Sequence, residues 1–236
     1  MDNALTDCYV QFIYGVVYLL FEAYPIVYTI EHGLNSGVTG LTFLPILVGT
    51  CLGVLGYLLI WSPRYEQLAS EFSPSPVPPE YRLTQAMWAV VMFFPTFFWF
   101  GWTSYPNISA WASMMSGTIL GFSVVWIYLA FYNYVIDSYL IFAASALAAN
   151  TIVRSIFGAA FPLFAIQMYN RLNPRWASTL LGIIATIMVP IPFILFRYGP
   201  ALRHRSKHAP KGIWYVGCVV LIRRIRWFNQ LSTDPN

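Results

Sequence analysis

The chain has 236 residues, of which 9% are charged, 58% hydrophobic and 18% aromatic. Soluble globular proteins carry about 25% charged residues, so most of this surface cannot face water. The composition therefore excludes a soluble domain and predicts an all-α protein that crosses a lipid bilayer several times.

The net charge of +4 is concentrated near the C-terminus, where eight of the 13 basic residues lie at or after Arg197. Residues 203–236 are predicted to form a basic tail, which anionic lipid attracts by about 1 kcal/mol for each basic residue. Basic residues confined to a tail after the last apolar segment do not favour nucleic-acid binding. The expected partner of this tail is the bilayer surface.

Apolar runs of about 20 residues, the length that crosses a bilayer, occur six times. They are Cys8–Ile30, Thr39–Trp61, Ala86–Thr103, Ala110–Phe131, Ile136–Ile166 and Ala177–Phe196. Their connections are short except for residues 62–85, whose proline-rich run SPSPVPPE disfavours a helix. Residues 1–202 are thus expected to form one bundle of six antiparallel membrane helices.

The basic residues also predict an orientation. Arg64 and Arg82 lie in the long connection, on the same side as the tail, whereas Arg171 and Arg175 lie on the opposite side. Because cytoplasmic segments carry the excess of Lys and Arg, both termini and the long connection are predicted to be cytoplasmic.

Glu22 lies near the middle of the first predicted span. Loss of hydration there favours a protonated carboxyl, which suits a group that carries protons. The alternative is a structural glutamic acid held by hydrogen bonds or by a buried ion pair. Pro25 follows within one turn and predicts a kink that frees backbone carbonyls.

Aromatic and small residues mark further positions in the spans. Tyr18 and Trp126 either line a cavity that binds a cationic or aromatic ligand, or anchor and pack the helices. Glycines at helical spacing allow tight crossing of the second and fourth spans. The expected role of these glycines is packing, with a moving gate at the second and fifth spans as the alternative: Gly49, Gly53, Gly117 and Gly121.

The fifth predicted span contains Asn150 and Arg154. A guanidinium at membrane depth is costly unless it is paired or hydrated. Arg154 follows Asp137 by 17 residues, about 25 Å along a helix,. Arg154 therefore either reaches the far surface of the membrane, or lies near the midplane and pairs with Glu22 or with an anionic group of a substrate.

Signatures of enzymes are not found in the sequence. It contains no HExxH or GxSxG motif and no glycine-rich phosphate loop,. The spacing of Cys8, Cys51 and Cys218 indicates neither a metal site nor a disulfide framework. We expect no catalysis, no bound metal and no cofactor.

The runs YGVVYLLFEAYPIVY, FFWFGWTSYP, NYVIDSYLIFAASALAANTIVRSIFGAAF and PIPFILFRYGP resemble the C-terminal half of a major facilitator superfamily transporter. Within that family they are most similar to the fungal drug:proton antiporter branch, which includes multidrug and polyamine exporters. The resemblance covers residues 8–210. It implies two six-helix halves with a substrate cavity between them.

By this resemblance, the first and fourth spans line the cavity, the second and fifth meet the other half, and the third and sixth face lipid. Glu22 then lies at the cavity wall, and Asn150 and Arg154 lie on the helix between the halves. The implied function is proton-coupled export of small organic or cationic compounds from the plasma membrane by alternating access. The implied partners are protons, a small-molecule substrate and an N-terminal six-helix half.

Two features depart from the family pattern. The N-terminal half and its motifs are missing, and residues 212–236 are unlike a usual family tail. A single half supplies one wall of the cavity. The alternative is therefore a non-transporting fragment, or a half-subunit that needs a partner half.

Overall fold

The computed structural model describes residues 2–73, 77–105, 107–139 and 143–204, and every regular element within these ranges is helical. The predicted all-α fold is confirmed. Two of the elements, η1 and η2, have π-helical hydrogen bonding. In chain order the elements are α1 (Asp2–Pro25), η1 (Ile26–Glu31), α2 (Ser36–Leu41), α3 (Leu44–Gly56), η2 (Tyr57–Trp61), α4 (Ser62–Phe72), α5 (Glu80–Thr103), α6 (Ala110–Tyr139), α7 (Ala143–Met188) and α8 (Pro190–His204).

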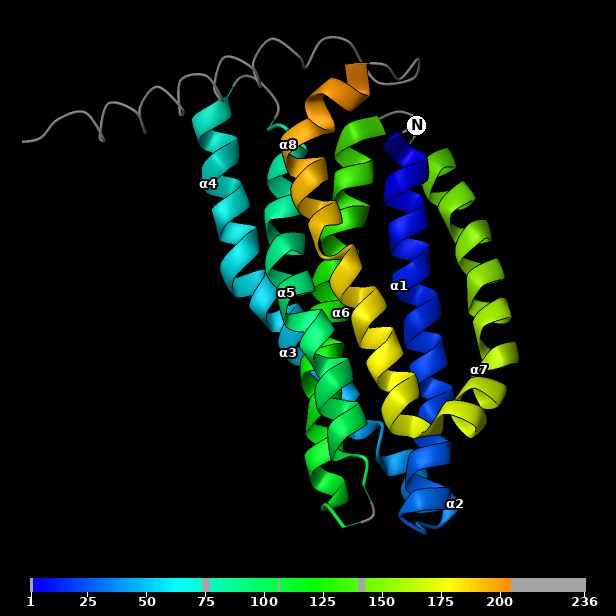
Figure 1. Ribbon diagram of the computed structural model, residues 1–236. Coiled ribbons are helices and arrows are strands. Elements are labelled where there is room, and N and C mark those ends of the chain that lie inside the picture. The colour runs from blue at the N-terminus through cyan, green and yellow to red at the C-terminus, as the bar shows by residue number, and fades with distance from the viewer. Residues whose placement is uncertain (1, 74–76, 106, 140–142, 205–236) are drawn as a thin grey trace, which may run out of the picture.

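Six helical stretches within the described residues are long and apolar enough to cross a membrane, as predicted. The protein is therefore a multi-pass membrane protein. The helices alternate in direction along one bundle axis, and α1 begins at the same end of the bundle as α8 finishes (Figure 1). The six stretches are Tyr9–Ile30, Ser36–Phe72, Glu80–Thr103, Ala110–Ser138, Ala143–Tyr169 and Arg171–Tyr198.

The fifth and sixth spans meet at a sharp bend inside α7. Asn173 has φ 60° and ψ 152°, which divides α7 into two helices. Asparagine tolerates positive φ better than most residues, and the following Pro174 disfavours a helical conformation at Asn173. The chain therefore reverses direction here, at the end of the bundle opposite the N-terminus (Figure 1).

The predicted connection between the second and third spans, residues 62–85, is too long. Residues 62–72 form α4, and α5 already begins at Glu80. α4 follows η2 without a break, and Pro63 lies in its first turn. The helix therefore continues beyond Trp61, and the mixture of polar and apolar residues in α4 hides this extension from a search for apolar runs.

The predicted fifth span, Ile136–Ile166, begins too early. α6 extends to Tyr139 and α7 starts at Ala143, so Asp137 and Arg154 lie on different helices. Arg154 is about 17 Å from the start of α7, nearer the middle of the 27-residue span Ala143–Tyr169 than either end. The distance from Asp137 therefore gives no reason to place Arg154 at the membrane surface.

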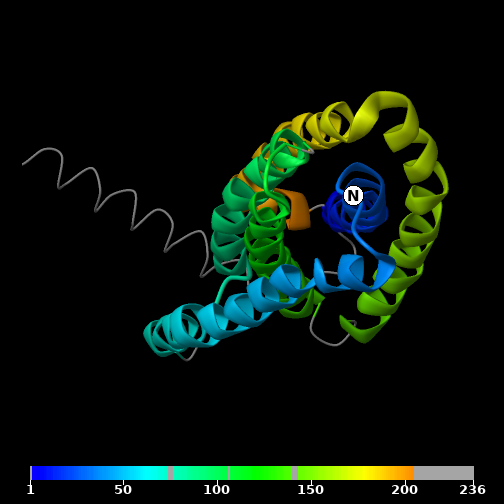
Figure 2. The same cartoon turned by 90° about the horizontal axis from the view of Figure 1, so that it is seen from below.

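α1 forms the centre of the bundle. Viewed along the bundle axis, it lies inside an arc made by α7, with α5 and α6 beside it (Figure 2). Aromatic side chains fill this core, and the ring of Tyr24 stacks on Phe100 of α5 at 5.2 Å. Of the 18 consecutive residues that make up the most apolar part of the first span, 61% are buried.

The second and fifth spans are covered least. In the most apolar 18 residues of Ser36–Phe72 only 11% are buried, and in those of Ala143–Tyr169 only 6% are buried. Both spans carry large exposed apolar side chains, such as Leu52 on α3 and Ile156 on α7. Most residues of the predicted tail, 205–236, lie outside the described residues, so the boundary near residue 202 stays a prediction.

Candidate functional site

One face of α1 carries four polar side chains: Gln11, Tyr14, Tyr18 and Glu22. Residues three or four positions apart lie on the same face of a helix, so these four form a continuous line about 17 Å long. We call this set the polar stripe of α1. It faces side chains from α6 and α7, and it supplies amide, hydroxyl and carboxyl groups within an apolar span.

Arg154 of α7 meets the polar stripe at Tyr14. The guanidinium carbon of Arg154 lies 5.0 Å from the centre of the Tyr14 ring, and Nη1 donates a hydrogen bond to the Tyr132 hydroxyl at 3.1 Å. The Tyr14 hydroxyl in turn donates to the Tyr18 hydroxyl at 2.8 Å. The ring of Tyr128 contacts Tyr14 edge-on at 6.2 Å. These five residues form a tyrosine–arginine cluster between α1, α6 and α7.

The chemistry of the tyrosine–arginine cluster suits a mixed polar and aromatic ligand. The tyrosine rings offer electron-rich faces to a cation, while their hydroxyls both donate and accept hydrogen bonds. The Tyr128 hydroxyl is buried without a hydrogen-bond partner among the described residues. Since buried polar groups are normally paired, this hydroxyl is available to a polar group that enters the cluster.

Asn150 lies one helical turn before Arg154 and contacts the polar stripe at Gln11. The Gln11 amide donates to the side-chain oxygen of Asn150 at 2.7 Å and to its backbone carbonyl at 3.1 Å. Both residues are buried. This pair fixes α7 against α1 beside the tyrosine–arginine cluster.

Glu22 lies one turn beyond Tyr18 and is half-buried. No hydrogen bond or ion pair joins Glu22 to another described residue. Among these residues, the ion pair is formed by Arg82 and Asp137. Glu22 follows Tyr14 by two helical turns, about 12 Å along α1, so it does not pair with Arg154. Glu22 therefore ends the polar stripe without a partner among the described residues.

Trp126 lies apart from the tyrosine–arginine cluster. Its ring packs against Phe122 at 4.5 Å and edge-on against Trp61 at 5.8 Å. Its indole N–H donates to the Gly53 carbonyl oxygen at 2.8 Å. With 6% of its surface exposed, Trp126 packs α6 against α3 and does not lie beside Tyr18.

The four glycines lie where α3 crosses α6. A Cβ atom on Gly49 would clash with the Thr118 carbonyl oxygen, and one on Gly121 would clash with the Ile46 carbonyl oxygen. Gly53 faces α6 and Gly117 faces Ile46 and Tyr24 in the same way. The two backbones are therefore in contact, which only glycine permits.

Pro25 and Asp137 lie near the two ends of the bundle. At Pro25 the backbone of the first span changes from α- to π-helical hydrogen bonding, a change often found near functional sites. Asp137 accepts hydrogen bonds from Arg82 Nε at 2.9 Å and from the Tyr65 hydroxyl at 3.3 Å. It therefore joins the ends of α4, α5 and α6.

Two signals for this site were overlooked in the sequence. Gln11 was not predicted, although its spacing from Tyr14, Tyr18 and Glu22 already places four polar residues on one helix face. The tyrosines at positions 14, 128 and 132 are indistinguishable from interfacial anchors until Arg154 is placed between them. Within the described residues, no group of three His, Cys, Asp or Glu side chains could hold a metal ion.

Comparison with known proteins identifies the family. The multidrug transporter mdrA of Aspergillus fumigatus, named as a major facilitator superfamily protein, is 42% identical over 207 residues, which are 88% of this chain and 34% of the relative. The chain belongs to the major facilitator superfamily. An uncharacterised transporter of this type from Schizosaccharomyces pombe is 43% identical over 208 residues, 88% of this chain and 40% of the relative. The efflux pump MFS2 of Trichophyton rubrum is 40% identical over 205 residues, 87% of this chain and 34% of the relative.

The predicted family is thus confirmed. The chain spans between a third and two fifths of the length of these curated relatives of the major facilitator superfamily. No protein-family profile matches the chain, and no solved structure matches it.

Proposed function

We propose that this chain is the C-terminal six-helix half of a proton-coupled exporter of small organic or cationic compounds. The observation that carries the proposal is the polar stripe of α1, which runs through the centre of a six-span bundle and ends at Glu22, a carboxyl group without a partner among the described residues. Relatives named as multidrug transporters and efflux pumps support this function. The proposed location is the plasma membrane, with both termini in the cytoplasm.

In this proposal Glu22 carries the coupled charge. It alternates between binding a proton and binding a cationic group of the substrate, because one carboxylate cannot hold both. The tyrosine–arginine cluster binds the apolar and aromatic part of the substrate, and Arg154 holds the Tyr14 and Tyr132 side chains in position. The Gln11–Asn150 pair keeps α7 in register with α1.

The other wall of the cavity is proposed to come from an N-terminal six-helix half. The sparsely covered spans α3 and α7 supply the surface for this contact, because their exposed apolar side chains have no cover within the described residues. Alternating access then requires the two halves to rock against each other around the site.

The test uses membrane vesicles with an imposed pH gradient. The chain is produced alone and fused behind the first six helices of the Aspergillus fumigatus relative, and export of a fluorescent cationic dye is followed. We expect gradient-dependent export from the fusion and none from the chain alone. In the fusion, Glu22→Gln should abolish the dependence on the pH gradient while Glu66→Gln, on the exposed surface of α4, leaves it intact.

A second candidate function is a membrane half-subunit that does not transport. The sparse cover of the second and fifth spans fits this candidate, since one half provides one cavity wall and leaves that surface for a partner. A well-folded fusion that exports no dye would favour the second candidate. Undiminished coupling in Glu22→Gln would instead remove Glu22 from the mechanism.

A further inference from the structure

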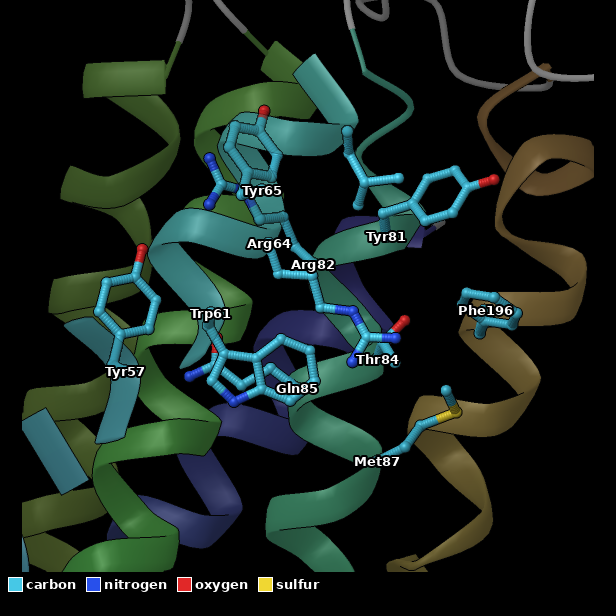
Figure 3. Close-up of a pocket in the computed structure, with 11 residues that line it drawn as sticks. Tyr57, Trp61, Arg64, Tyr65, Tyr81, Arg82, Thr84, Gln85, Met87 and Phe196 are labelled. Atoms are coloured by element: carbon cyan, nitrogen blue, oxygen red, sulfur yellow. The ribbon is translucent and has the colours of Figure 1, made fainter. Parts of the chain in front are cut away.

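A cavity of about 250 Å³ lies between η2, α4, α5 and α8, away from the tyrosine–arginine cluster. Figure 3 shows its lining, in which Trp61, Arg64 and Tyr65 come from η2 and α4, Arg82 from α5 and Phe196 from α8. Among the described residues, two arginines and no carboxylate line it. We call it the α4–α5–α8 pocket.

The sequence changes from apolar to polar around this pocket. Arg64 follows the apolar run that ends at Trp61, Arg82 precedes the run that begins at Ala86, and Phe196 ends the sixth run. Three apolar segments thus change to polar sequence around one cavity. Arginine, tyrosine and tryptophan are the side chains that concentrate where membrane spans end.

The pocket offers hydrogen-bond donors that lack acceptors. The guanidinium of exposed Arg64 contacts the Trp61 ring at 5.6 Å and forms no ion pair with a described residue. The Trp61 indole N–H is buried without an acceptor among the described residues. Arg82 donates from Nε to Asp137 and also forms a side-chain hydrogen bond with Tyr65, and its side chain lines the cavity.

This donor set selects an acceptor-only, negatively charged group. Guanidinium groups match phosphate oxygens in geometry as well as charge. The cavity is smaller than the range of about 300 to 1,000 Å³ that is usual for drug-sized ligands. Its size therefore favours a headgroup whose acyl chains remain outside, and basic pockets between membrane helices are known to bind such lipids.

We propose that the α4–α5–α8 pocket binds the phosphate of an anionic phospholipid. The phosphate is held by the guanidinium groups of Arg64 and Arg82 and by the indole N–H of Trp61, while the acyl chains lie along α5 and α8. Asp137 accepts a hydrogen bond from Arg82, and the Arg82 guanidinium carbon lies 3.3 Å from the centre of the Tyr65 ring. These two contacts hold the Arg82 side chain at the cavity wall. This site is independent of the proposed transport activity.

The test measures lipid retention by the purified 236-residue chain. The chain is incorporated into nanodiscs of phosphatidylcholine containing one fifth phosphatidylinositol, extracted into mild detergent, and its bound lipids are counted by native mass spectrometry. We expect phosphatidylinositol to be retained in preference to phosphatidylcholine. Arg64→Ala should reduce this preference about fivefold, the effect of one arginine near an anionic membrane.

Two further variants make the test decisive. Arg171→Ala removes the same charge at the opposite end of the bundle and should retain the lipid preference. Trp61→Phe keeps the aromatic ring but removes the N–H, and should weaken retention without changing the helical content seen by circular dichroism. Equal retention by wild type, Arg64→Ala and Trp61→Phe would overturn the proposal, as would equal losses in Arg64→Ala and Arg171→Ala.

A competition arm separates a lipid from a free anion. Inorganic phosphate at about 10 mM is concentrated enough to compete for a weak anion site. It should not displace the bound phosphatidylinositol, because the soluble ion lacks acyl chains. Full displacement at that concentration would show a phosphate-ion site and would contradict the lipid assignment.

Discussion

Polar side chains persist in the apolar interior of this bundle where another helix supplies their partner. Gln11 on α1 finds Asn150 on α7, and Arg154 on α7 finds Tyr132 on α6. Each contact joins two different helices, so each one specifies how those helices are rotated as well as offsetting its own cost of burial. Glu22 differs, because it has no such partner among the described residues.

The Gln11–Asn150 contact gives a prediction about stability. Gln11→Leu removes the donor of both hydrogen bonds to Asn150, and should lower the free energy of unfolding by about 1 to 3 kcal/mol. Thermal unfolding in detergent, followed by circular dichroism, measures the change. Ile13→Leu, a buried isomer exchange on the same helix, is the control and should cost less. Equal effects of the two substitutions would mean that the hydrogen bonds contribute nothing.

The Arg82–Asp137 ion pair predicts coupling between two helices. Its side chains are 15% and 22% exposed, so removal of one partner leaves the other poorly hydrated. Arg82→Gln and Asp137→Asn should each destabilise the protein, and the double variant should lose less than the sum. A double-mutant cycle on thermal unfolding is expected to give a coupling energy of about 1 kcal/mol. Strict additivity would contradict this.

At the scale of the elements, the crossing of α3 and α6 is the closest backbone contact that the glycines define. The carbonyl oxygens of Thr118 and Ile46 lie where side chains would otherwise be. Trp126 adds a hydrogen bond to the Gly53 carbonyl at the same crossing. α3 and α6 are therefore packed backbone to backbone, even though most of the α3 surface is exposed.

Substitution of one glycine should separate that pair. In Gly49→Ala the new Cβ meets backbone, which cannot rotate away, and we expect a loss of about 2 kcal/mol in stability. Gly40→Ala is the matched control, since nothing lies within 4 Å of its Cβ position. The control should gain slightly, because alanine favours a helix over glycine. A similar melting temperature for both variants would show that the crossing is looser than described.

At the scale of the whole molecule, the six spans were predictable because a bilayer demands apolar runs of a fixed length. The predicted ends of the spans were wrong where the helices continue beyond the apolar runs. α4 was missed because Glu66 and Gln67 are polar, although no proline or glycine interrupts the stretch after Pro63. Asp137 was assigned to the fifth span because the apolar runs on both sides of residues 140–142 are continuous in sequence.

The partners within the candidate site could not be predicted in this way. Spacing placed Tyr18 and Glu22 on one face of a helix, but the neighbours of Arg154 depend on how three helices are rotated. The polar residues of the site were therefore recognisable singly, and the contacts among them required the structure.

The exposed faces of α3 and α7 predict a change when a partner half is present. With Cys8 and Cys218 replaced by serine, a spin label on exposed Cys51 of α3 should be accessible to oxygen dissolved in the bilayer. Fusion to an N-terminal half should lower that accessibility severalfold, measured by electron paramagnetic resonance. A label at Trp88→Cys, on the exposed face of α5, is the control and should not change. Unchanged accessibility at both positions would place the partner elsewhere.

The continuity of α3, η2 and α4 has a mechanical consequence. From the crossing at Gly49 to the end of α4 at Phe72, the chain is helical throughout, a length of about 35 Å. Such a rod acts as a lever whose fulcrum is the glycine contact. A tilt of about 10° at the fulcrum would displace the end of α4 by about 6 Å, so a small rotation in the bundle becomes a large movement at its surface. The hydrogen bond from the Tyr65 hydroxyl to Asp137 restrains this long helix partway along its length.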